Sequence, residues 1–88
     1  MKSIRWWPHA RERLVERGID IKLVRSALEK PDQIITMGKQ KIIHKLYQET
    51  SRHKEYLLRV FIEDFEEEQV IRTVYRTSKV SKYWRNQS

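Results

Sequence analysis

This 88-residue sequence contains no cysteine and only two glycines and two prolines. The lack of cysteine excludes a disulfide framework, a zinc ribbon and a thiol nucleophile, so hydrophobic packing and backbone hydrogen bonds must hold the fold together. The scarcity of glycine and proline, together with 39% hydrophobic residues, argues against a disordered chain. At this length we expect a single domain that spans residues 1–88.

Long apolar runs are also missing. No stretch approaches the length of a membrane span, and the basic N-terminal segment lacks the apolar run of a signal peptide. We therefore expect a cytoplasmic protein that makes no contact with membranes.

Acidic residues are scarce over most of the chain. Nineteen Lys and Arg residues face twelve Asp and Glu residues, which gives a net charge of +7. Five of the twelve acidic residues lie between Glu63 and Glu68, and none follows Glu68. Such an excess favours a polyanionic partner over a small neutral ligand. We interpret the acidic segment as a solvated turn and expect neither a metal nor a cofactor.

Helix signals dominate the first third of the chain. Pro8 suits the first turn of a helix, and Gly18 is typical of the left-handed residue just after a helix ends. Asp20 is a good N-cap for a second helix, which must stop before Pro31. These signals predict two short helices packed as a hairpin.

A period of two replaces the helical period after residue 33. The alternation predicts strands over 34–37, 41–47, 56–63 and 70–77, and residues 79–88 are expected to add one helical turn. We therefore expect an α+β fold. Two N-terminal helices would pack on one face of a three- to four-stranded antiparallel meander sheet, with a short C-terminal helical tail and the other face open.

One pair of residues near the start suggests catalysis. Cleavage of RNA without a metal needs a base, an acid and cations that stabilise the developing negative charge. Histidine titrates nearest to neutral pH, and Arg13 would lie beside His9 one helical turn along. A structural role for His9, bonded to a neighbouring backbone group, is an equal alternative. His44 and His53 are interpreted as a core-edge histidine and an exposed one.

The last strand and the tail carry the other candidate residues. Arg72 is predicted to bind a phosphate, and Tyr75 to donate a proton or stack on a base, so that both join His9 and Arg13 in the catalytic set. Val70 and Val74 alternate with Arg72 and Arg76 on one face, which leaves open whether the arginines face solvent or extend past a core edge. The predicted nucleic-acid contacts are Arg59, Arg76, Lys79, Lys82 and Arg85.

The opening motif carries a family resemblance. The pattern His9-Ala10-x-x-Arg13-x-x-x-Arg17-Gly18-Ile19, with the strand segment 70–76, resembles small uncharacterised bacterial and archaeal proteins that look like members of the RelE/ParE-like toxin superfamily. The resemblance extends from about His9 to Tyr83. It implies a toxin of a toxin-antitoxin pair. Most characterised members are metal-independent ribonucleases that cut messenger RNA, often on the ribosome, and one branch poisons DNA gyrase.

Three functional hypotheses follow. The first is a toxin-like, metal-independent ribonuclease that acts on messenger RNA and is controlled by a cognate antitoxin protein. The second is a nucleic-acid-binding module without chemistry, which the high charge supports equally well. The third is a toxin directed at gyrase or another protein. The oligomeric state stays open, with a homodimer among the alternatives.

Overall fold

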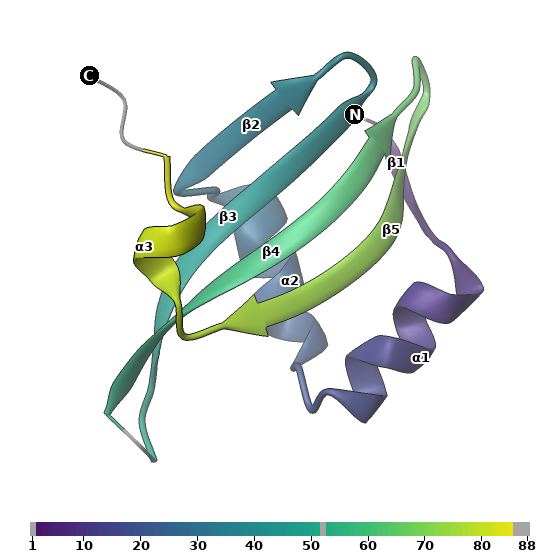
Figure 1. Cartoon of the computed structure of the whole chain (residues 1–88). Coiled ribbons are helices and arrows are strands. Elements are labelled where there is room, and N and C mark those ends of the chain that lie inside the picture. The colour runs from purple at the N-terminus through teal and green to yellow at the C-terminus, as the bar shows by residue number, and fades with distance from the viewer. Residues whose placement is uncertain (1, 52, 86–88) are drawn as a thin grey trace.

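The computed structural model describes residues 2–51 and 53–85 and has an α+β fold, as the sequence predicts (Figure 1). A strand opens the chain, two helices and a four-stranded meander follow, and a single helical turn closes it. In chain order the elements are β1 (Ser3–Trp6), α1 (Pro8–Glu16), α2 (Ile21–Glu29), β2 (Gln33–Met37), β3 (Gln40–Glu49), β4 (Lys54–Asp64), β5 (Glu68–Thr77) and α3 (Val80–Tyr83). No helix among the described residues is long and apolar enough to cross a membrane.

The sheet contains five strands in the order β1-β5-β4-β3-β2. Strands β2 to β5 form the antiparallel meander that the alternation predicts. The prediction that two helices open the chain is wrong, because β1 precedes them and pairs in parallel with β5, from Ser3 opposite Glu68 to Trp6 opposite Ile71. The sheet is therefore mixed. A four-residue edge strand is too short to establish a period of two, so the sequence pattern does not reveal it.

The helix boundaries agree with their sequence signals. Helix α1 begins at Pro8, and Gly18 takes a φ of +63°, the left-handed conformation that ends it. The Asp20 carboxylate accepts a hydrogen bond of 2.9 Å from the backbone N–H of Lys22 and caps α2. The corner between α1 and α2 is therefore short and well defined. The prediction that the two helices pack as a hairpin is wrong, because α1 packs mainly on β5 and α2 on β3 and β4.

Helices α1 and α2 cover one face of the sheet, and α3 lies on the other (Figure 1). Apolar side chains from the helices and from alternate strand positions form the core between them. These residues are Ala10, Leu14, Ile19, Val24 and Ala27 on the helical side, and Ile43, Leu58, Val60, Ile62, Ile71 and Val74 on the sheet. We call the opposite side of the sheet the front face.

Two rungs of paired residues make up the centre of the front face. In the first rung Phe61 pairs with Ile42 on one side and with Thr73 on the other. In the second rung Arg59 pairs with His44 on one side and with Tyr75 on the other. Because successive side chains point to opposite faces, these residues point away from α1 and α2.

A β-bulge interrupts β5. Thr73 pairs with Phe61 and Ile71 pairs with Ile62, so Arg72 is an extra residue without a partner in the register. The predicted unbroken alternation over 70–77 is therefore wrong, and Arg72 and Arg76 do not share a face: Arg76 pairs with the core residue Leu58. A bulge adds one residue and re-aims the side chains beside it, which a period of two cannot reveal.

Candidate functional site

The front face has two ends, and α3 covers one of them. At this covered end the Arg59 side chain is nearly enclosed, with Arg59 only 9% exposed. Its Nε donates a hydrogen bond of 3.1 Å to His44 Nε2, and its Nη1 donates to the Tyr75 hydroxyl. His44 Nδ1 lies 2.9 Å from Gln33 Oε1 and donates to it, since Nε2 is the acceptor. A hydrogen-bonded chain therefore crosses the sheet from β5 to β2.

Aromatic rings surround the Arg59 guanidinium. Its Cζ lies 4.3 Å from the ring centroid of Tyr83, 5.0 Å from that of Phe61 and 5.4 Å from that of Tyr75. Within residues 2–51 and 53–85, no ion pair joins Arg59 to a carboxylate. The π faces and the two hydrogen-bond acceptors therefore take over the stabilisation that a carboxylate would give.

His44 is fully buried and uncharged at neutral pH. Burial, with the positive charge of Arg59 next, lowers the pKa of His44 to about 4. Both ring nitrogens are engaged, and Trp84 stacks on the ring with its centroid 6.2 Å away. His44 therefore orients Arg59 and has no lone pair available to take a proton from a substrate.

The tail is fastened over the covered end through β2. The Gln33 side-chain amide donates to the carbonyl of Arg85, and the Arg85 N–H donates to Gln33 Oε1 at 3.2 Å. These bonds hold Tyr83 and Trp84 against Arg59 and His44.

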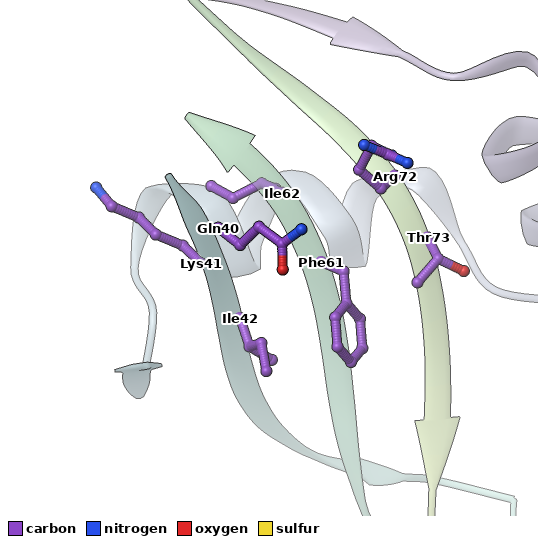
Figure 2. A pocket seen from close by; sticks show the side chains of 7 residues that line it. All are labelled: Gln40, Lys41, Ile42, Phe61, Ile62, Arg72 and Thr73. Carbon is purple, nitrogen blue, oxygen red and sulfur yellow. The ribbon is translucent and has the colours of Figure 1, made fainter. Parts of the chain in front are cut away.

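The open end of the front face contains a pocket of about 180 Å³ (Figure 2). Ile42 and Phe61 give it apolar walls, and the Gln40 side chain reaches from β3 toward Phe61. In the described part of the chain, the side chains of Gln40 and Thr73 make no hydrogen bond to protein. The pocket is lined by Gln40, Lys41, Ile42, Phe61, Ile62, Arg72 and Thr73.

The bulged residue Arg72 lies at the edge of this pocket. Its Nη1 is 2.5 Å from Glu63 Oε1, and its Cζ lies 3.6 Å from the centroid of the Trp7 ring. The side chain is 37% exposed. The guanidinium thus has a fixed position and still reaches solvent.

The structure separates the four residues predicted as catalytic. His9 lies on α1 with its side chain 80% exposed, 3.6 Å from Glu12 Oε2, and Arg13 is exposed one turn along. Over the described residues, no hydrogen bond, ion pair or ring contact links either one to Arg72 or Tyr75. Arg72 and Tyr75 do share the front face.

The predicted nucleic-acid contacts divide in the same way. Lys79, Lys82 and Arg85 have exposed side chains in and beside α3, next to the covered end. Arg76 lies on the helical side of the sheet, where its Nη1 is 3.8 Å from Glu49 Oε2. Arg59 is on the front face but is buried.

Sequence reasoning missed the residues that shape the pocket. Phe61 follows Arg59 by two positions on an alternating strand, a signal that places both on one face. Gln40 and Thr73 have no comparable signal, because only the register of β3, β4 and β5 brings them to one place. In the part of the chain that is described, no three His, Asp or Glu side chains gather as a metal site.

Comparison with known proteins gives one match. No curated protein and no solved structure matches the chain. One family model matches residues 6–76, a range that includes the opening motif, helices α1 and α2 and nearly all of strands β2 to β5. The chain therefore belongs to the family described as "Domain of unknown function (DUF4258)".

Proposed function

We propose that this protein binds single-stranded RNA on its front face. The observation that carries the proposal is a pair of aromatic rings on neighbouring strands, Phe61 and Tyr75, stacked with centroids 5.7 Å apart beside a pocket. Sheet faces with such aromatic pairs bind single-stranded nucleic acid of any sequence, because every base has a flat face that can stack on a ring.

Cations close to these rings support the same proposal. Arg72 lies at the edge of the pocket, and Lys79, Lys82 and Arg85 extend from a segment that contains no acidic residue. Arginine and lysine side chains in such positions neutralise phosphates and release counterions. The aromatic pair would take the bases while the cations hold the backbone.

Salt dependence of binding tests the proposal. We would measure fluorescence anisotropy of a labelled RNA strand between about 50 and 200 mM salt. Replacing Lys79, Lys82 and Arg85 by Gln should reduce the slope of log K against log salt by about 2, because each phosphate contact contributes about 0.7. The matched control replaces Lys22, Arg25 and Lys30 by Gln, which removes the same charge from exposed positions in and next to α2.

Two outcomes would contradict the proposal. Equal losses in the two triple variants would mean that binding follows net charge and not the front face. Absence of binding by the unaltered protein at low salt would remove the proposal altogether.

Cleavage of the bound RNA is a second candidate function, as the RelE/ParE-like resemblance implies. It is favoured by the Tyr75 phenol, a possible proton donor on the same face as Arg72. The protein would be added to a cell-free translation extract, and new 5′ ends of a reporter message would be mapped. Ends that vanish in Tyr75→Phe and persist in His9→Ala would place cleavage on the front face. Ends that vanish in His9→Ala and persist in Tyr75→Phe would assign cleavage to His9 instead. A message that stays intact would mean that the protein binds RNA without cleaving it. A cognate antitoxin would cover this face.

A further inference from the structure

We infer that the outer edge of β2 pairs with β2 of a second copy of this chain, in an antiparallel arrangement centred on Ile35. The inference does not depend on the proposed RNA binding and adds a surface for self-association. Three features of β2 carry it: an unprotected edge, backbone groups that point outward, and opposite charges at its two ends.

The two edges of the sheet, β1 and β2, differ in their protection (Figure 1). Strand β2 contains no charged residue and no proline, and its register with β3 runs without a bulge. Strand β1 is shorter, with four residues, and contains Arg5. Charges, prolines, bulges and short length are the devices that keep sheet edges from pairing. Strand β2 lacks the first three, and its Ile34 and Met37 are 46% and 49% exposed.

The backbone of β2 offers hydrogen bonds on its outer side. The His44 carbonyl accepts a bond of 2.9 Å from the N–H of Asp32, so the even-numbered residues of β3 direct their backbone groups toward β2. Their register partners in β2 are the odd-numbered residues. The N–H and C=O groups of Ile34 and Thr36 therefore point away from β3. Within residues 2–51 and 53–85, no strand pairs with that side.

An antiparallel second copy complements this edge. Centring the pair on Ile35 places Ile34 opposite Thr36 of the other copy, so the outward N–H and C=O groups of both residues are paired. The exposed Asp32 precedes the strand and the exposed Lys39 follows it. Antiparallel pairing brings these opposite charges together at both ends, whereas parallel pairing would bring like charges together. The two-fold pair joins the sheets into one, with both front faces on the same side.

Sedimentation velocity over a range of protein concentrations tests the inference. The unaltered protein should form a dimer, and high salt should strengthen it, because two copies with a net charge of +7 repel each other. Thr36→Pro should weaken association by about tenfold or more, since it removes half of the hydrogen bonds across the interface and none to β3. Ile34→Lys should act in the same way without altering the backbone, because it adds the kind of charge that protects natural edges.

The matched control is Ile4→Pro on the other edge of the sheet. The N–H of Ser3 donates to the Glu67 carbonyl at 3.2 Å, so that of Ile4, the next residue, points away from β5. The control therefore removes an outward N–H from an apolar residue of similar exposure, 49% against 46% for Ile34. Association should be unchanged. Circular dichroism checks that each variant is folded.

A crosslink tests the register of the pair. The chain has no cysteine, so Ile35→Cys introduces a single thiol. In the proposed pair this position faces its own copy without backbone bonds between the two residues, where Cα atoms lie about 4.5 Å apart and a disulfide can form. Mild oxidation should therefore give a covalent dimer. Thr36→Cys should crosslink more slowly, because its two thiols would be offset by two residues along the strands.

Several results would overturn the inference. A monomer at every concentration would do so and leave the edge to an extended segment of another protein. A dimer that persists in folded Thr36→Pro and Ile34→Lys, or that is lost equally in Ile4→Pro, would place the interface elsewhere. Faster crosslinking of Thr36→Cys would contradict the register. Association that high salt dissolves would mean that nucleic acid bridges the copies. RNA binding is measured separately by anisotropy, so either proposal can fail without the other.

Discussion

The two ends of the front face contain the same kinds of residue in opposite states. At the covered end Arg59 is buried, its guanidinium is caged by three rings, and its neighbour His44 has both nitrogens bonded. At the open end the Arg72 side chain is 37% exposed, and the Gln40 side chain makes no hydrogen bond within the described residues. An arginine on a sheet face is thus a structural element where a helix covers it and a candidate ligand contact where none does.

The difference follows from what burial does to a charge. A cation removed from water loses several kcal/mol of solvation, which only close and numerous contacts can offset. The covered end supplies such contacts from β3, β5 and α3, so Arg59 is fixed as part of the fold. The open end lets Arg72 keep its hydration, and exchange of that water for a phosphate costs little.

The largest effect that would sharpen this comparison is on stability. Arg59→Ala should lower the free energy of unfolding by about 3 kcal/mol, because it opens a cavity and leaves His44 Nε2 without a donor. Arg72→Ala should cost less than about 1 kcal/mol, since it removes a partly exposed ion pair. Urea unfolding of both variants measures the two values. Similar losses would contradict the division of the face into a structural and a ligand-binding end.

The second effect is on the pH dependence of stability. His44 takes up a proton near its ordinary pKa of 6.5 in the unfolded chain but only near a pKa of about 4 in the folded one. The unfolded state therefore binds more protons between these values, and the free energy of unfolding should fall as the pH drops from about 6.5 to 4, by roughly 3 kcal/mol in all. Urea titrations across this range measure the slope.

His44→Gln is the control, because it removes the titrating group. The slope between pH 6.5 and 4 should flatten in this variant, whatever the change in stability at neutral pH. The half-buried Asp64 affects a different range. Its pKa is held below the ordinary value by Lys2 and then Lys41, so its contribution is lost at more acidic pH. A slope that persists in His44→Gln would show that His44 is not responsible.

The sequence predicted those parts of the fold whose causes are local. Pro8, Gly18 and Asp20 mark helix ends because each acts on its own turn, and the four meander strands follow from alternation with their neighbours. The pairing of β1 with β5 joins residues more than 60 positions apart, and no local pattern encodes it. The bulge at Arg72 is hidden for a related reason, since it exists only relative to β4.

The sequence likewise identified only some of the residues of the candidate site. Arg59 and Tyr75 were predicted as site residues from residue type and strand position, and the structure does place them side by side on the front face. That Arg59 would be buried depends on the docking of Tyr83 from a short tail helix, which type and position do not reveal. The tight turn at Gly38 places Gln40 at the start of β3, beside the pocket. His9 lies far from Tyr75 because α1 packs on the opposite face of the sheet.

The smallest expected effect on stability is also the most informative about the open end. Arg72→Gln and Arg5→Gln each remove one cation from a surface ion pair, with Glu63 and with Glu68, so each should cost about 0.5 kcal/mol or less. Both lower the net charge equally, but only Arg72 lines the pocket. RNA affinity should therefore fall about fivefold in Arg72→Gln and less than about twofold in Arg5→Gln, as read by anisotropy at one salt concentration. If both variants weaken binding equally, Arg72 acts only through net charge. The open end would then differ from the covered end in exposure and not in role.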